Sequence, residues 1–164
     1  MRGLILSGLM VLGVGVLNAK AKSGSWDFGG SVGLTQIGGN YYPKVTAYAK
    51  YNMMSTLSWR TDLSMVIRSV DDSSKFDLSV PSNLLYYPLG GKQGIDPYVG
   101  PGITWTHPYE GDDRFGGNVL LGVDFKFMKS TTFGVEARYT YDVLPEAKSG
   151  GWDMSLTGNW NVEF

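Results

Sequence analysis

The chain has 164 residues, enough for one domain, and its formal net charge of -1 gives no electrostatic basis for binding nucleic acid. It has no cysteine, which excludes disulfides, thiolate metal sites, a cysteine nucleophile and a lipid-modified N-terminal cysteine. Glycine is abundant, at 23 residues, and aromatic residues reach 13%, which is typical of many strands and tight turns rather than of helices.

The N-terminus has the pattern of a cleaved secretory signal peptide. Arg2 supplies a positive charge, an apolar stretch runs from Leu4 to Leu17, and Ala19-Lys20-Ala21 matches an A-x-A cleavage site. The apolar stretch is short for a membrane span, which argues against an uncleaved anchor. The sequence therefore predicts a signal peptide over 1–21 and an exported domain over 22–164.

Eight segments of the exported domain alternate apolar and polar residues, the period of an extended strand. In chain order we expect strands over 26–36, 42–51, 57–68, 76–87, 98–106, 118–127, 133–141 and 152–164. The last is the clearest, because apolar residues or glycine take every second position from Trp152 to Phe164 and polar residues lie between them. A transmembrane strand needs about 9–11 residues with this alternation. The fold class predicted is all-β, an eight-stranded antiparallel up-and-down transmembrane β-barrel.

The connections and the aromatic residues are consistent with a membrane barrel. Polar loops are expected over Val70–Lys75, His107–Gly117 and Asp142–Gly151, and tight turns after the second and sixth strands. The connection after the first strand is short and the one after the fourth, Gly90–Pro97, is long, so the alternation is imperfect. Aromatic residues are predicted to form two interfacial girdles, one of Trp26, Phe28, Tyr51, Tyr86, Tyr98, Phe127, Phe133 and Phe164, the other of Tyr42, Phe76, Trp105, Tyr139, Tyr141 and Trp152.

Two prolines lie inside expected strands. Pro81 falls in the fourth strand and Pro101 in the fifth, where each removes a hydrogen-bond donor from the ladder. We expect a β-bulge at each, with possible reversal of the faces beyond it, and the greatest irregularity of the barrel in these two strands.

The polar faces predict a charged lumen. The interior of an eight-stranded barrel is just wide enough to be filled by side chains, so the charges there should pair. The expected lumen charge network is Arg60, Asp62, Asp124, Lys126, Glu136 and Arg138. A three-residue turn at 129–131 would place Asp124 opposite Glu136, with Lys126 and Arg138 nearby, and Arg60 would reach Glu136 from the opposite wall. This network is interpreted as a polar core, with a gate on a narrow pore as the alternative.

Catalysis has weak support in the sequence. The single histidine, His107, lies at the expected outer end of the fifth strand, and no serine is close to it in sequence. Glu110, Asp112 and Asp113 could attract a divalent cation, but their spacing is not that of a calcium loop, so a solvated acidic tip is the expectation. No catalytic residue, cofactor or metal site is predicted.

Three motifs carry a resemblance to a known family. These are Pro97-Tyr98-Val99-Gly100-Pro101-Gly102, the strand from Gly134 to Tyr141, and the terminal Trp160-Asn161-Val162-Glu163-Phe164. Together they resemble the small OmpA/OmpX-like outer-membrane barrels, the outer membrane protein β-barrel domain family. The resemblance spans the exported domain and implies that Trp160, Val162 and Phe164 form the signal read by the barrel-assembly machinery. It does not extend to a peptidoglycan-binding domain, so anchoring of the cell wall is not expected.

The resulting hypothesis is an integral protein of the outer membrane of a Gram-negative bacterium, with a structural or surface-interacting role and no catalysis. Expected partners are outer-membrane lipid and lipopolysaccharide, the barrel-assembly machinery and periplasmic chaperones during biogenesis, and an unidentified extracellular partner of the outer loops. Three alternatives remain: a narrow pore or transport barrel, a lipid A-modifying enzyme, and a soluble lipocalin-like ligand-binding barrel. Periodicity alone cannot distinguish the lipocalin-like barrel from a membrane barrel, because the same alternation results whichever face of the strands points inward.

Overall fold

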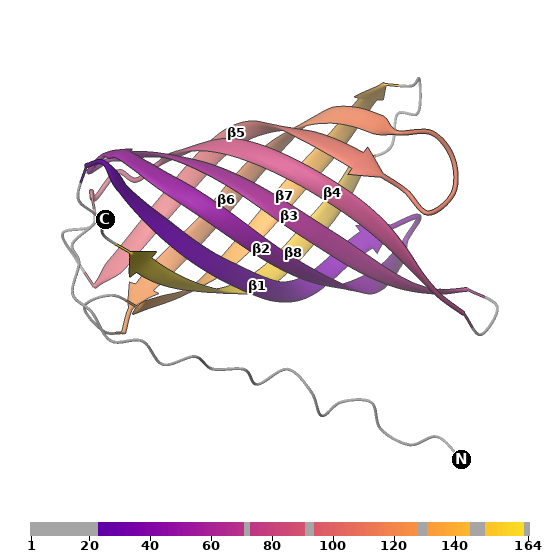
Figure 1. The fold of residues 1–164 in the computed structure, drawn as a ribbon, viewed down its shortest axis with the longest axis horizontal. Coiled ribbons are helices and arrows are strands. Elements are labelled where there is room, and N and C mark those ends of the chain that lie inside the picture. The colour runs from indigo at the N-terminus through magenta and orange to yellow at the C-terminus, as the bar shows by residue number, and fades with distance from the viewer. Residues whose placement is uncertain (1–22, 71–72, 91–93, 128–130, 145–149, 163–164) are drawn as a thin grey trace, which may run out of the picture.

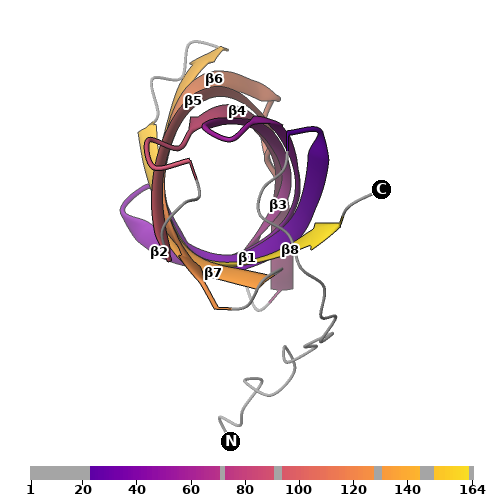
Figure 2. The same cartoon turned by 90° about the vertical axis from the view of Figure 1, so that its left-hand side faces the viewer.

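The protein is a single closed barrel of eight strands. The computed structural model describes residues 23–70, 73–90, 94–127, 131–144 and 150–162. The strands are β1 (Ser25–Ile37), β2 (Asn40–Met54), β3 (Leu57–Val70), β4 (Ser73–Tyr86), β5 (Ile95–His107), β6 (Arg114–Lys126), β7 (Thr131–Leu144) and β8 (Gly150–Val162). Each pairs antiparallel with the next, and β1 pairs with β8 to complete the ring (Figures 1 and 2). The described residues contain no helix that is long and apolar enough to cross a membrane.

The predicted fold class is confirmed, and the strands themselves set the inside and outside of the barrel. Along β3, Trp59 and Leu63 are 53% and 59% exposed, whereas Arg60 and Asp62 are 2% and 1% exposed. The same alternation holds on the other strands, so the exterior is apolar and the interior is polar and charged. A soluble lipocalin-like barrel would show the opposite arrangement, so that alternative is wrong.

Aromatic rings meet between strands near both ends of the barrel. We call the end where β1 begins and β8 finishes the termini rim, and the other end the far rim. Ring centroids lie 5.0 Å apart for Trp26 and Tyr51 at the termini rim, and 4.9 Å apart for Tyr139 and Trp152 at the far rim. These pairs agree with the predicted girdles, with one correction. Tyr98 is only 4% exposed and points into the lumen, because it lies two positions from Gly100 and so on the same, inward-facing side of β5.

The strands extend further than predicted, and the far-rim loops are correspondingly shorter. The expected loop Val70–Lys75 is a connection of only residues 71–72, with Arg68 paired to Lys75. The expected loop His107–Gly117 contracts to 108–113, and Asp142–Gly151 to 145–149. Near the rims both faces of a strand meet water, so the apolar alternation stops while backbone pairing continues. The stretch Gly90–Pro97 is likewise shortened, because β5 begins at Ile95.

The prolines interrupt the ladder without the expected bulges. Pairing is absent for two positions beside Pro81 between β3 and β4, and for two beside Pro101 between β4 and β5. It resumes in the same register each time, and each proline pairs normally on its other side, with Thr104 and Val119 respectively. Register shifts lie elsewhere, at Asn52/Met54 and at Phe115/Gly116. Each missing donor therefore interrupts the pairing on one side of its strand only, and the faces of β4 and β5 do not reverse beyond the prolines.

Two predictions concern residues outside those that the structure describes. The signal peptide over 1–21 is one, and Phe164 of the assembly signal is the other. Trp160 and Val162 lie on β8 opposite Phe28 and Trp26 of β1, so both belong to the seam that closes the barrel. Their role in recognition by the assembly machinery stays a prediction.

Candidate functional site

Four charged side chains from facing walls meet in the lumen. Arg60 and Asp62 come from β3, and Glu136 and Arg138 come from β7; we call them the lumen cluster. Arg60 donates from Nε to Asp62 Oδ1 at 2.7 Å and from Nη1 to Glu136 Oε2 at 2.8 Å. Arg138 donates from Nη2 to Asp62 Oδ2. Two guanidinium groups and two carboxylates thus neutralise one another, and all four residues are at most 9% exposed.

Two tyrosines and a serine support the cluster. The Arg60 guanidinium lies 3.7 Å from the centroid of the Tyr48 ring, a cation–π contact. Glu136 accepts hydrogen bonds from Tyr98 Oη at 3.1 Å and from Ser155 Oγ at 2.9 Å. Both oxygens of the buried Glu136 carboxylate therefore accept further hydrogen bonds besides those from Arg60, which offsets the cost of burying the charge. Tyr98 lies two positions before the inward-facing Gly100, and this alternation along β5 was the one sequence signal that could have placed the Tyr98 side chain in the lumen.

Glycines make room for both tyrosine rings. Tyr48 is the register partner of Gly29, and Tyr98 is the register partner of Gly122. A Cβ at Gly29 would lie 2.5 Å from Tyr48 Cζ, and one at Gly122 would collide with the Tyr98 ring. Each ring therefore lies across a glycine of the neighbouring strand and reaches the strand beyond it: the Tyr48 hydroxyl donates to Gly158 O of β8 at 3.3 Å, and the Tyr98 hydroxyl donates to Glu136 of β7.

The remaining predicted network residues are placed differently from the expectation. Asp124 pairs in register with Gly134, and Glu136 with Gly122, so the two carboxylates are not opposite each other. The turn between β6 and β7 is centred one residue earlier than assumed, since Lys126 pairs with Thr132 and the Phe127 amide donates to Thr131 O at 3.1 Å. This shift of two residues keeps both carboxylates facing inward. Lys126 ends β6 at the termini rim with an exposed side chain, so it lies outside the buried cluster.

Below the cluster, toward the termini rim, the lumen is filled by apolar and paired groups. Leu85, Tyr87, Tyr98 and Leu120 form a buried core, with Leu85 and Leu120 fully buried. Beside them, Lys50 Nζ lies 3.0 Å from Asp27 Oδ2 and donates to Tyr87 Oη at 3.3 Å. Asp96, which was expected in the connection Gly90–Pro97, is instead buried on β5 and is the register partner of Asp124.

His107 pairs with an acidic residue of the far-rim loop. Its Nδ1 lies 2.6 Å from Asp113 Oδ1, and Trp105 Nε1 donates to Asp113 Oδ2 at 3.1 Å. The hydrogen bond from His107 is the main cause that lowers the pKa of the Asp113 carboxyl from its ordinary value. Within the described residues no serine hydroxyl is hydrogen-bonded to this imidazole, and no group of three or more histidine and acidic side chains is arranged to hold a metal ion.

A closed, eight-stranded barrel with a charged interior and an apolar, aromatic-rimmed exterior is a transmembrane β-barrel. No protein-family model and no curated protein matches the sequence. Among solved structures, the chain is similar to Neisserial surface protein A (NspA), with a TM-score of 0.66 and 12% identity over 83% of this chain and 95% of that one. It is similar to OprG from Pseudomonas aeruginosa, with a TM-score of 0.61 and 15% identity over 87% and 98% of the two chains. It is also similar to the outer membrane enzyme PagL, with a TM-score of 0.53 and 17% identity over 83% and 99%.

At these identities the likeness establishes the fold alone. The chain has the fold of the small outer-membrane barrels, in agreement with the resemblance found in its sequence. One of the three similar proteins is named as an enzyme, so the fold by itself does not separate catalytic from non-catalytic members.

Proposed function

We propose that the protein is an integral barrel of the outer membrane of a Gram-negative bacterium, with a structural or surface-interacting role, a lumen closed by its own side chains, and no catalysis. The observation that carries the proposal is the lumen cluster. Arg60 of β3 joins Glu136 of β7 across the interior, and Arg138 joins Asp62 in the opposite direction. The apolar core around Leu85 and Leu120 adjoins the cluster, since its Tyr98 donates to Glu136 and Leu120 is the register partner of Arg138.

The cluster supports a closed lumen on energetic grounds. Removing any one of its four charges leaves a partner charged and buried, which costs about 3–5 kcal/mol for a buried pair. Opening a water-filled path would require several of these contacts to separate together. An eight-stranded barrel also leaves little interior space beyond that which side chains occupy.

The surroundings of His107 favour a non-catalytic role. An acyl-transfer or hydrolytic site needs a nucleophile within hydrogen-bond reach of its base. Here Asp113 occupies one ring nitrogen, and no serine among the described residues is bonded to the ring. The imidazole and the carboxylate are both more than half exposed, so they also lack the water-excluded setting of most active sites.

The far rim supports a surface-interacting role. The loop 108–113 is held against the β3–β4 hairpin, since the Tyr109 amide donates to Asp77 Oδ1 at 2.7 Å and Lys75 donates to the Tyr109 hydroxyl. A loop held in this way presents a preorganised surface, which lowers the entropic cost of binding a partner. The chemistry of the partner is open.

Planar-bilayer recording tests the closed lumen. The refolded wild-type protein is expected to show no stable stepwise conductance. A variant that removes the whole neutral cluster, R60A/D62A/E136A/R138A, is expected to conduct, while Lys126→Ala at the termini rim should behave as wild type. A stable wild-type conductance that the quadruple variant leaves unchanged would establish the pore alternative instead.

Cell experiments test the location and the enzymatic alternative. The protein is expected in the outer-membrane fraction and to migrate differently in detergent gels before and after heating. Lipid A from cells that overproduce the wild type or His107→Ala is expected to have the same acylation by mass spectrometry. Loss of an acyl chain only with the wild type would make the protein an enzyme and overturn the proposal.

A further inference from the structure

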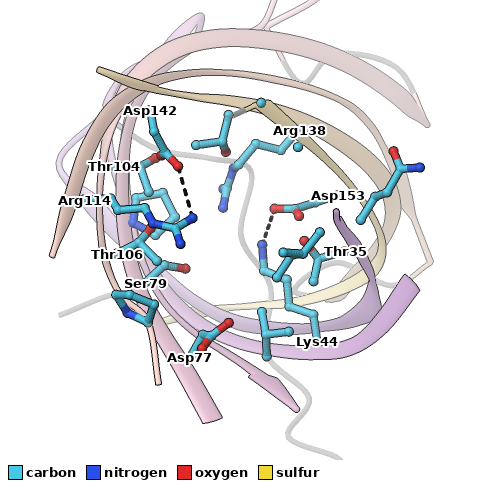
Figure 3. A pocket seen from close by; sticks show the side chains of 18 of the residues that line it. Thr35, Lys44, Asp77, Ser79, Thr104, Thr106, Arg114, Arg138, Asp142 and Asp153 are labelled. Carbon is cyan, nitrogen blue, oxygen red and sulfur yellow. Dashed lines mark hydrogen bonds and ion pairs between the residues drawn. The ribbon is translucent and has the colours of Figure 1, made fainter. Parts of the chain in front are cut away.

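Asp124 of β6 is a buried carboxylate without an ion-pair partner among the described lysines and arginines. The contrast is clear in the polar cavity between the lumen cluster and the far rim, where Figure 3 shows the ion pairs Lys44–Asp153 and Arg114–Asp142. Asp124 is 5% exposed, so water does not solvate its charge freely. A buried charge without a counter-charge is costly, so this carboxylate needs one from another source.

The side chains around Asp124 do not supply that charge. Its register partners are Asp96 on β5, which is another carboxylate, and Gly134 on β7, which has no side chain. Lys50 is the buried lysine between the cluster and the termini rim, and its ammonium pairs with Asp27 at 3.0 Å. Either a proton or a bound cation must therefore neutralise Asp124.

A second side-chain oxygen approaches Asp124 over Gly134. Gly134 is the register partner of Asp124 on one side and of Thr157 of β8 on the other. The position that a Cβ at Gly134 would take is 2.6 Å from Thr157 Oγ1 and 2.7 Å from Asp124 Oδ1. The two oxygens are therefore no further apart than the sum of these distances. They can approach this closely because residue 134 has no side chain.

The Thr157 hydroxyl has no hydrogen-bond partner within the described residues. Thr157 is 4% exposed and its Oγ1 is buried, yet it bonds neither to Asp124 nor to any other described group. Buried hydroxyls are normally bonded, so this oxygen points to a bound ligand. A proton on Asp124 or a water molecule would meet only one of the two needs, whereas a cation between the oxygens neutralises the carboxylate and uses the lone pairs of the hydroxyl.

We propose that Asp124 Oδ1 and Thr157 Oγ1 bind a small hard cation of the sodium or calcium type over Gly134. Such cations take oxygen ligands, and calcium takes them at about 2.3–2.6 Å in a flexible arrangement that water molecules can complete. One ion at that distance from both oxygens bridges a separation of up to about 5 Å, which agrees with the limit set over Gly134. The site needs one carboxylate and one hydroxyl, so it does not require a group of three acidic side chains, which the described residues do not provide.

This site goes beyond the structural role proposed above and does not require the lumen to conduct. The ion would join β6 to β8 across β7 and so stabilise the end of the barrel near the termini rim. Asp124 lies two residues before the end of β6 at that rim, so the ion reaches it without passing the lumen cluster.

The test is titration of the refolded full chain in non-ionic detergent with calcium chloride and, separately, with sodium chloride. N-methylglucamine chloride keeps the ionic strength constant. The ¹³Cγ resonance of Asp124 and the methyl resonance of Thr157 are followed by NMR, and calorimetry measures the affinity. We expect saturable shifts of both resonances with at least one of the two ions, and the ion that binds more tightly is the occupant.

Three variants locate the site. Thr157→Val keeps the side-chain volume and removes the oxygen, so the affinity should fall about tenfold, the loss expected for one polar contact to a charged group. Thr35→Val is the matched control, because Thr35 is a 6% exposed threonine at the far-rim end of the interior, and it should change the affinity less than about threefold. Asp124→Asn should abolish binding. It removes an unmatched buried charge, so without the cation it should unfold at no lower urea concentration than wild type.

Three outcomes would overturn the proposal. The first is the absence of saturable shifts with either ion in the wild type, which decides the matter even if a variant fails to fold. The second is a ¹³Cγ shift of a neutral carboxyl at neutral pH that neither ion changes, since a proton would then neutralise Asp124. The third is equal affinity of wild type and Thr157→Val.

Discussion

Arg60 of β3 and Glu136 of β7 form a two-pronged ion pair across the lumen, with Nη1–Oε2 at 2.8 Å and Nη2–Oε1 at 3.2 Å. The two residues are 76 positions apart in the chain and lie on facing walls. The planar guanidinium matches the carboxylate geometry on one edge and holds Asp62 on the other. This pair therefore fixes the relative position of two walls that share no backbone hydrogen bonds.

The first prediction concerns the coupling between these two residues. Glu136→Met or Arg60→Met alone leaves an unmatched buried charge and should lower the free energy of unfolding by about 3–5 kcal/mol. The double variant leaves Asp62 and Arg138 as a neutral pair, so its loss should be smaller than the sum by about 1–3 kcal/mol. Urea unfolding in detergent micelles measures all three. Lys126→Met serves as an exposed control and should stay within about 0.5 kcal/mol of wild type. Additive effects of the two single changes would contradict the coupling.

The second prediction concerns the glycine beneath the Tyr98 ring. Gly122→Ala places a methyl group in the ring and should cost about 1–3 kcal/mol, because Tyr98 must move and loosen its bond to Glu136. Gly117→Ala on the same strand is the matched control. A Cβ there would find only Gly102 O, at 3.9 Å, so this variant should be neutral or slightly stabilising. Equal unfolding free energies for the two variants would show that Tyr98 does not depend on Gly122.

The third prediction concerns the depth of the apolar exterior. Leu121 lies near the middle of β6 and is 48% exposed, whereas Phe127 follows the end of the strand and is 67% exposed. Leu121→Arg should cost about 2–4 kcal/mol on folding into a lipid bilayer, and Phe127→Arg only about 0–1 kcal/mol, because charge is tolerated near the interface. Folding titrations in large unilamellar vesicles measure both. A smaller cost at Leu121 than at Phe127 would mean that the membrane is not centred on the barrel as its apolar surface implies.

The fourth prediction concerns pH. The hydrogen bond from His107 lowers the pKa of the Asp113 carboxyl in the folded protein. A carboxyl with a lowered folded-state pKa stabilises the fold at pH values above its unfolded pKa, and that stabilisation disappears as the pH falls through the lowered value. The hydrogen bond between His107 and Asp113 should therefore anchor the loop at neutral pH. It should be lost only when the pH falls below the ordinary pKa of an aspartate, which is about 4. His107→Ala should raise the pKa of Asp113 in a ¹³C NMR titration, and His107→Asn, which can still donate, should raise it less. An unchanged titration in His107→Ala would exclude the hydrogen bond as the cause.

The sequence was sufficient for the strands and their faces, because a period of two is a local property that each strand repeats. Trp59, Arg60 and Leu63 illustrate this, since their alternation along β3 already separated lipid-facing from lumen-facing residues. The pairing of Arg60 with Glu136 followed from the same reasoning, given that β3 and β7 face each other in an eight-stranded ring.

The register and the strand ends could not be predicted in the same way. The position of Glu136 relative to Asp124 depends on the residue at which one turn is centred, and the sequence pattern did not reveal that Lys126 pairs with Thr132. The Tyr98 side chain was assigned to a girdle because aromatic residues are common there, but its neighbour across the ladder is a glycine that leaves space inside.

The seam between β1 and β8 has a consequence for how the protein enters a bilayer. From Trp26 to Thr35, β1 finds its partners on β8, between Asp153 and Val162. An open sheet would expose both edges, and each unpaired backbone group costs several kcal/mol in hydrocarbon. Partly assembled barrels are therefore unstable within the membrane core and prone to edge-to-edge association outside it. Insertion and closure must proceed together, so a change that weakens the seam should reduce the yield of inserted protein more than the stability of barrels that have already closed.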